Sequence, residues 1–216
     1  MTARTTAHLA PVCDDTLSAL IDMRGEDIAS LFQQSQEAAV DRIQGIVTEL
    51  RIACDFRRLD AFLFPAMGME TKEAREQLDK EYKAACQLKV NAEQRQGVPF
   101  KGFEAAPVLR YSNQATFHPL KYLGGLVEAI KAQKGRLFAH SPVVEVEETK
   151  DRVRVVTENG NVVTAKHAVF ATNSPINDRV AIHSKMAPYR TYAMAFTIPR
   201  GTIPDALYWD MADPYH

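Results

Sequence analysis

The stretch from Ala168 to Pro175 holds the residues best suited to binding a ligand. An apolar run from Ala168 to Ala171 is followed by Thr172, Asn173 and Ser174. A buried strand of this kind would bring small residues and a turn to its carboxyl end, where open α/β sheets bind ligands. An ordinary strand followed by a loop explains the same residues, and their spacing alone does not decide between the two interpretations.

Other kinds of chemistry have no motif in the sequence. The six histidines show no i, i+4 pair and no H-x-x-E companion: His8, His118, His140, His167, His183 and His216. Ser174 and Ser184 lack the glycines of a nucleophile elbow. The three cysteines never form a C-x-x-C pair, which argues against a disulfide framework or a zinc knuckle. We therefore expect no metal site and no hydrolase chemistry.

The first half of the chain predicts helices around one strand. Apolar residues recur three or four positions apart from Asp14 to Leu50, and Gly25 can divide this segment into two helices. Asp14 and Asp15 supply a capping carboxylate. The run Arg58 to Phe64 predicts a short strand, and another helix should begin after Thr71.

The second half predicts mainly strands. Val108 to Tyr111 is strand-like, and Pro119 suits the first turn of a helix that His118 can cap and that continues to Gly135. Further strands are expected at 136–140, 143–148, 152–157, 162–166, 168–172, 192–198 and 206–209. Asn159-Gly160 indicates a hairpin with a type I′ turn. This order predicts an α/β fold interleaved with antiparallel sheet.

Composition excludes several classes of protein. Of the 216 residues 46% are hydrophobic and 25% charged, which is typical of a globular protein with a core. The formal charge of -1 removes the usual electrostatic reason to expect a nucleic-acid partner. No apolar run approaches the roughly 20 residues that cross a bilayer, and no signal peptide is evident. We expect a cytoplasmic protein that binds neither nucleic acid nor membrane.

Several segments together resemble the FAD-dependent D-amino-acid oxidase and glycine oxidase family. They are Gly135 to Val146, Val153 to Thr157, Asn159-Gly160 and Ala168 to Asn173. The segments Gln114 to Tyr122 and Asp205 to His216 are similar to a subgroup that often carries a Rieske iron–sulfur domain after the flavin part. The resemblance implies a partial FAD-binding, Rossmann-like domain at 114–177. It also implies a discontinuous substrate domain with an antiparallel sheet, at 14–113 and 178–216.

The resemblance also assigns residues to the cofactor. Val143 matches the position whose backbone contacts the adenine portion of FAD, and Ala171 and Thr172 match the strand end beside the ribose and pyrophosphate. Asn173 stands where many members of the family have glycine. On the substrate side the matching residues are Tyr208, Trp209, Tyr215 and His216; Tyr208 and Trp209 equally suit a plain sheet core.

One family feature is missing from the sequence. The family opens with a G-x-G-x-x-G turn whose backbone N–H groups hold the pyrophosphate, and none of the 10 glycines here has that spacing between a strand and a helix. We therefore expect an internal piece of such a protein, one that alone binds FAD weakly or not at all.

The resemblance implies oxidation of an amino acid or related amine by hydride transfer to the flavin. The electron acceptor, oxygen or a carrier such as a Rieske centre, stays open, and no catalytic residue is assigned. An alternative is a non-catalytic module that pairs with a partner chain supplying the missing Rossmann segment. Such a module would expose apolar surface when alone.

Overall fold

The computed structural model describes residues 2–12, 15–172 and 192–212. The chain divides into two compact units, each with its own sheet. The first unit combines Met1–Ala132 with Phe196–His216, and the second is Gln133–Ala195. The fold is mixed α/β with antiparallel sheets, as the order of elements in the sequence predicted.

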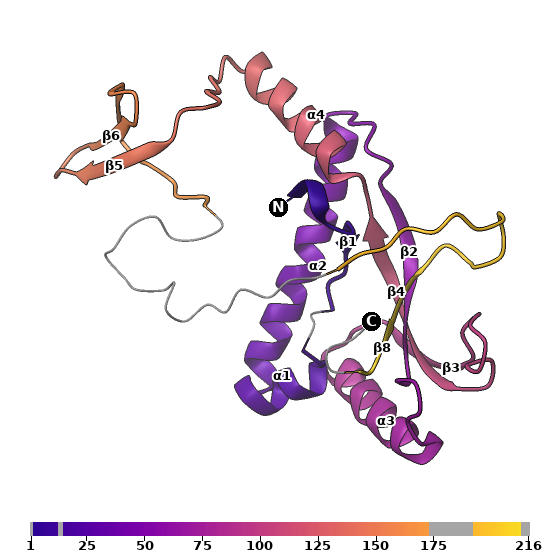
Figure 1. Ribbon diagram of the computed structural model, residues 1–216. Helices are drawn as coiled ribbons and strands as arrows, with labels where there is room; N and C mark the ends of the chain where they lie inside the picture. The colour runs from indigo at the N-terminus through magenta and orange to yellow at the C-terminus, as the bar shows by residue number, and fades with distance from the viewer. Residues whose placement is uncertain (1, 13–14, 173–191, 213–216) are drawn as a thin grey trace. The chain divides into compact units, whose positions relative to one another are not determined.

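The sheet of the first unit is built around one long central strand (Figure 1). Its strands are β1 (His8–Leu9), β2 (Arg57–Phe64), β3 (Ala92–Gln96), β4 (Pro107–Thr116) and β8 (Leu207–Asp210). One edge of β4 pairs with antiparallel β2, and β1 and β3 pair with the two ends of its other edge. β8 joins the far edge of β2 in parallel, with Ala61 opposite Leu207.

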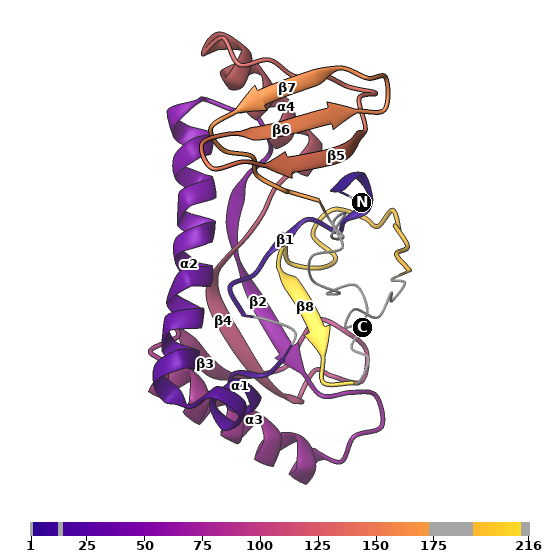
Figure 2. The ribbon, with the colours of Figure 1, turned by 90° about the vertical axis from the view of Figure 1, so that its left-hand side faces the viewer.

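Three helices supply the other half of the core of this unit. They are α1 (Leu17–Arg24), α2 (Glu26–Glu49) and α3 (Thr71–Gln87). α2 runs along the sheet, while α1 and α3 lie at the end where β3 is found (Figures 1 and 2). The buried cluster joins Leu17, Ala29 and Leu78 of the helices to Leu63 and Tyr111 of the sheet. Since side chains alternate along a strand, the neighbours of Leu63 face away from the helices.

The start of α1 is capped differently from the expectation. Thr16 is the N-cap and accepts from Ala19 N at 3.2 Å, whereas a carboxylate of Asp14 or Asp15 was expected there. Asp14 lies outside the described residues. The carboxylate of Glu81, on α3, accepts from Leu17 N at 2.7 Å and from Ser18 N at 3.0 Å. A helix start leaves its first N–H groups without partners inside the helix. Glu81, which is distant in the sequence, therefore accepts hydrogen bonds from the start of α1, a role that was predicted for a neighbouring aspartate.

Gly25 divides the first two helices, as predicted. Its φ is 78°, and its N–H closes α1 on Ile21 O at 2.8 Å. An L-residue pays a steric penalty in this backbone region that glycine does not. The chain can therefore turn from α1 directly into α2.

The helix predicted after His118 is also present. α4 (Pro119–Ala132) begins at the proline, and His118 Nδ1 accepts from Lys121 N at a long 3.4 Å. The segment that follows α2 packs on α4, because Gly125 lies directly against the side chain of Ile52.

This contact gives a matched pair of glycine variants. Gly124→Ala is expected to raise the free energy of unfolding by about 0.5–1 kcal/mol, because an added Cβ meets nothing within 4 Å and glycine weakens a helix. Gly125→Ala is expected to lower it by about 1–2 kcal/mol, because the Cβ would lie 2.6 Å from Ile52 Cγ1. Urea unfolding of both variants checks the prediction; equal effects would contradict the packing of Ile52 on α4.

The second unit contains the three-stranded meander that the sequence predicted. β5 (Val143–Glu148), β6 (Val153–Thr157) and β7 (Val162–Ala165) are antiparallel in this order. One face carries Val146, Val155 and Val163 side by side, while Arg154 on the other face forms an ion pair with Glu147 at 3.0 Å. The meander therefore has an apolar and a polar face.

The hairpin at Asn159-Gly160 is present, but its turn type differs from the prediction. Only Gly160 has a positive φ, 76°, and its N–H donates to Thr157 O at 2.8 Å. A type I′ turn needs a positive φ at both central residues, which Glu158 and Asn159 do not have. The turn is therefore of type I, and it is followed by Gly160 in the left-handed region.

Strand predictions were wrong in three described segments. Arg136–His140, Ala168–Thr172 and Tyr192–Ile198 have no strand pairing among the described residues. Backbone turns at Lys134 and His140, both with positive φ, bracket the first. The other two are apolar but exposed, with Val169 at 89% and Tyr192 at 87%. Apolar residues form a strand only where a neighbouring strand pairs with them, which sequence spacing does not reveal.

Candidate functional site

Val143 lies where a backbone contact to a ligand is feasible. It faces Thr157 in the first pair of the β5–β6 ladder, and the flanking Glu158 N donates to Pro142 O at 2.9 Å. In an antiparallel ladder, a pair flanked in this way has its own N–H and C=O directed away from the partner strand. β5 is an edge strand among the described residues, so these two groups of Val143 point to a free edge.

Ala171 and Thr172 lie in an irregular, exposed segment of the same unit. Their small side chains leave their backbone open to close approach. Asn173 lies outside the described residues. The structure therefore describes the surroundings of three of the four predicted cofactor residues, and their role in binding stays a prediction.

FAD fits these residues through backbone and small side chains. The free edge at Val143 and the exposed backbone at Thr172 suit an adenosine portion, which needs backbone donors and room. Neither they nor Ala171 carries a charge to hold a pyrophosphate. Any contact that they make with a phosphate would therefore come from backbone N–H groups or from the Thr172 hydroxyl.

Tyr208 and Trp209 of β8 lie on opposite faces of the first unit's sheet. The Trp209 ring stacks on Tyr111 at 5.8 Å between centroids, on the helix-covered face, so it packs with the core. Tyr208 stacks on Phe62 at 5.3 Å on the other face. Burial, and secondarily the carboxylate of Asp205, raise the pKa of Tyr208 above its ordinary value. Tyr215 and His216 lie outside the described residues.

An aromatic cluster surrounds Tyr208, and the sequence analysis missed it. Phe100 meets the Tyr208 ring edge-on at 5.0 Å, and Phe64 contacts both Phe100 and Phe103. The alternation of Phe62 and Phe64 along β2 was the available signal, since it places two aromatic rings on one face of a strand. The partners from the 97–106 loop could not be inferred from spacing.

Arg110 lies on the same face of the sheet but is fully engaged. Asp60 and Glu93 bind its guanidinium at 2.8 and 2.9 Å. The two carboxylates raise the pKa of Arg110, and hydrogen bonds from Arg95 and Arg110 lower the pKa of Glu93. A guanidinium that is already paired with two carboxylates is not available to bind the carboxylate of a substrate.

A cavity of about 390 Å³ opens at the amino end of α4. Its lining includes Asp55, Arg57 and His118. Lys121 donates to Asp55 at 2.6 Å and lowers the pKa of that carboxyl, and Arg57 holds Asp205 through two hydrogen bonds of 2.6 and 3.0 Å. The charges at this cavity are thus already paired within the protein.

The described part of the chain has neither a metal-binding cluster nor a membrane-spanning helix. No group of three or more His, Cys, Asp or Glu side chains there could hold a metal ion. No helix in those ranges is both long and apolar enough to cross a membrane.

The sequence of the whole chain matches a family of flavoenzymes. The family model described as FAD dependent oxidoreductase matches residues 1–216, and the chain belongs to this family. A relative from Bacillus subtilis (strain 168) is YhfW, which is named as a Rieske 2Fe-2S iron–sulfur protein. It is 27% identical over 215 residues, which are 99% of this chain and 41% of YhfW.

Solved structures show the same fold. Glycine oxidase from Geobacillus kaustophilus has a TM-score of 0.59 at 12% identity, over 76% of this chain and 43% of that one. L-Amino acid deaminase from Proteus myxofaciens, in complex with anthranilate, has a TM-score of 0.55 at 13% identity, over 74% and 34% respectively. This chain thus spans less than half the length of each of these proteins.

Proposed function

We propose that this chain forms part of an enzyme that oxidises an amino acid or a related amine. The observation that carries the proposal is the family match over all 216 residues. The fold shared with a glycine oxidase and an L-amino acid deaminase supports it. FAD, when bound, would supply the hydride acceptor.

The proposed roles follow the domain division that the family resemblance implies. Residues 114–177 would form the flavin side, with the backbone of Val143 on the adenine portion and Ala171, Thr172 and Asn173 beside the ribose and pyrophosphate. Residues 14–113 and 178–216 would form the substrate side. There Tyr208, Trp209, Tyr215 and His216 are the candidates, and the face of the sheet with the aromatic cluster suits an apolar substrate group.

A Rieske domain is a proposed partner. The name of YhfW supports it, since that relative is similar to this chain over 41% of its own length. An iron–sulfur centre would take electrons from the reduced flavin in place of oxygen. Stopped-flow measurement of flavin reoxidation with and without oxygen separates the two acceptors.

The isolated chain is expected to bind FAD with a dissociation constant weaker than about 10 µM. The physical reason is that its 216 residues contain no glycine-rich turn to hold the pyrophosphate through backbone N–H groups. Isothermal titration with FAD, together with the visible spectrum of the purified chain, checks this. A yellow chain with micromolar or tighter binding would show that the turn is dispensable.

A second function is favoured by exposed apolar surface in the second unit. Val144, Val163 and Val169 are 64%, 53% and 89% exposed. An uncovered face of this kind suits a module that pairs with a partner chain. A chain that stays colourless with FAD and associates with a separately produced glycine-rich segment would support this alternative.

In the complete flavin-containing protein, Thr172→Trp is expected to lower bound flavin by about tenfold or more, or about 1.4 kcal/mol in binding. A bulky ring would occupy the space where the cofactor is proposed to pass. Thr164→Trp is the control, because Thr164 is also exposed but lies on β7. The ratio of flavin absorbance to protein and the melting of the apoprotein are measured on one preparation. Normal flavin content in Thr172→Trp would refute the assignment.

A further inference from the structure

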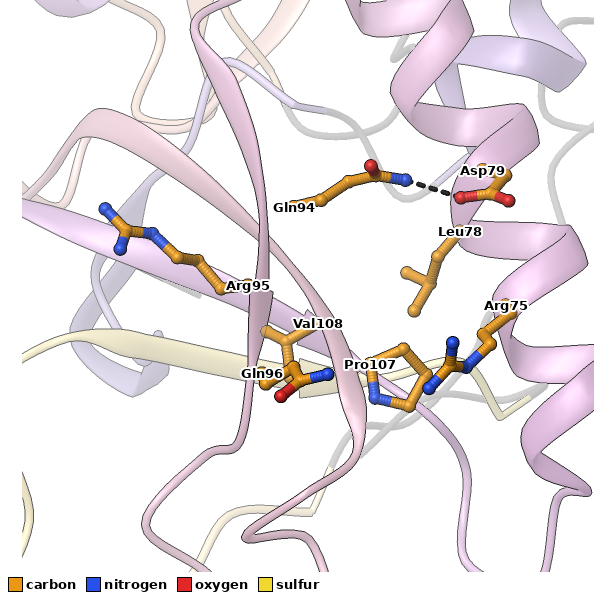
Figure 3. Close-up of a pocket in the computed structure, with 8 residues that line it drawn as sticks. All are labelled: Arg75, Leu78, Asp79, Gln94, Arg95, Gln96, Pro107 and Val108. Atoms are coloured by element: carbon orange, nitrogen blue, oxygen red, sulfur yellow. Dashed lines mark hydrogen bonds between the residues drawn. The ribbon is translucent and has the colours of Figure 1, made fainter.

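A cavity of about 530 Å³ lies between α3 and the strands β3 and β4, within the first unit (Figure 3). Its floor on the side of α3 is apolar: Leu78 is only 3% exposed, and Pro107 lies opposite it. None of its residues belongs to the cofactor or substrate positions described above. The candidate residues named above therefore assign no role to this cavity.

Two opposite charges line this cavity without compensation. Arg75 and Asp79 lie one turn apart on α3, a spacing at which such side chains often pair. Here they form no ion pair with each other, nor with any other residue of the described chain. Asp79 accepts only one hydrogen bond, from Gln94 Nε2. The guanidinium of Arg75, which has no partner among the described residues, and the carboxylate of Asp79, which is bonded only to Gln94, thus border one apolar floor.

The side chains are also directed suitably. In Figure 3 Arg75 and Gln96 extend toward Pro107 from opposite sides, and Asp79 and Gln94 lie together at the other end. The amide of Gln96 has no hydrogen-bond partner among the described residues, so it can join Arg75 in donating to an anionic group. Arg95 points away, and Glu93 already binds it at 2.6 Å.

We infer that this cavity binds a small zwitterion, an α-amino acid with an apolar side chain. The carboxylate would accept hydrogen bonds from Arg75 and Gln96, since a guanidinium matches a carboxylate with paired donors. The ammonium would donate to the remaining lone pairs of Asp79. The apolar side chain would cover Leu78 and Pro107. Such a site lies apart from the aromatic face of the sheet and could sense an amino acid without reacting with it.

The test uses leucine, in both enantiomers, titrated into the flavin-free chain and followed by NMR shifts of backbone amides in α3 and β3. Binding is expected in the millimolar range, because the site is open and its charges are partly solvated. Leucine methyl ester, which lacks the carboxylate, and 4-methylpentanoate, which lacks the ammonium, should each bind about tenfold more weakly.

Variants assign the effect to the two charges. Arg75→Gln and Asp79→Asn should each weaken leucine binding by about tenfold, while Arg95→Gln, a change in the same cavity, should leave it unchanged. Melting temperatures confirm that all three variants are folded. The proposal is overturned if leucine shifts no amide of α3 or β3 at 50 mM, a concentration about tenfold or more above the expected dissociation constant. It is equally overturned if Arg75→Gln binds normally, or if 4-methylpentanoate binds as tightly as leucine. Loss of FAD binding would not affect any of these outcomes.

Discussion

Replacing Glu81 by alanine is expected to lower the free energy of unfolding by about 3 kcal/mol or more. The side chain is 3% exposed and accepts from Leu17 N and Ser18 N at the start of α1. Tyr111 Oη also donates to it at 3.3 Å. Removing the carboxylate leaves two helix N–H groups without an acceptor in a place that water does not reach freely. Urea unfolding measures the change.

Two further variants make this prediction specific. Glu81→Gln keeps one oxygen acceptor and should cost about half as much as Glu81→Ala. Glu76→Ala, on the exposed side of the same helix, should change stability by less than about 0.5 kcal/mol, since its pair with Lys72 is long and solvated. If Glu81→Ala changed stability as little as Glu76→Ala, the hydrogen bonds between Glu81 of α3 and the start of α1 would not contribute to stability.

Replacing Gly97 by alanine is expected to cost about 2–4 kcal/mol. Its φ is 79°, and an added Cβ would lie 2.3 Å from the backbone oxygen of Glu104. The loop cannot relieve this contact by moving a flexible side chain. It would have to open the hydrogen bond from Gly97 N to Ala106 O, which is 2.9 Å long.

The matched control is Gly102→Ala in the same loop. Gly102 also has a positive φ, 89°, but nothing lies within 4 Å of an added Cβ. Gly102→Ala should therefore lower the free energy of unfolding only by the backbone strain of the new residue, about 1 kcal/mol. Because Phe100 and Phe103 belong to this loop, Gly97→Ala should also disturb the aromatic cluster around Tyr208. Near-ultraviolet circular dichroism of the two variants reports this, and identical spectra and stabilities would contradict the close approach at Gly97.

The helices could be predicted because their signals are local. Gly25 marks the break between α1 and α2, and the proline after His118 marks the start of α4; both are visible within a few residues. The meander of β5, β6 and β7 was equally clear, because alternating valines flank a glycine turn.

What the sequence did not reveal depends on distant partners. Glu81 accepts a hydrogen bond from Leu17 N at the start of α1, 64 residues earlier in the chain, and no local sequence pattern predicts such a bond. β3 is polar, Ala92–Gln96, and forms a strand through its backbone pairing with β4. Conversely, Ala168–Thr172 has the composition of a buried strand without a paired neighbour in the described chain.

In the candidate site, too, some features could be predicted from the sequence and others could not. A resemblance assigned Val143 and Thr172, and the ladder geometry around Val143 supports a backbone role that its apolar side chain could not suggest. All of the assigned cofactor and substrate roles stay predictions, and Asn173, Tyr215 and His216 lie outside the described residues. The charged cavity beside α3 was not foreseen, since no sequence motif marks Arg75 and Asp79 as a site.

The parallel pairing of β2 with β8 determines when the sheet can be finished during synthesis. Arg57, at the start of β2, and its ion-pair partner Asp205, just before β8, are 148 residues apart. At about 5–20 residues per second a ribosome needs about 7–30 s to make that interval. For that time the outer edge of β2 has no native neighbour, and an open strand edge can pair with other chains. A nascent chain of this protein thus passes through a period in which chaperone binding would protect one particular edge.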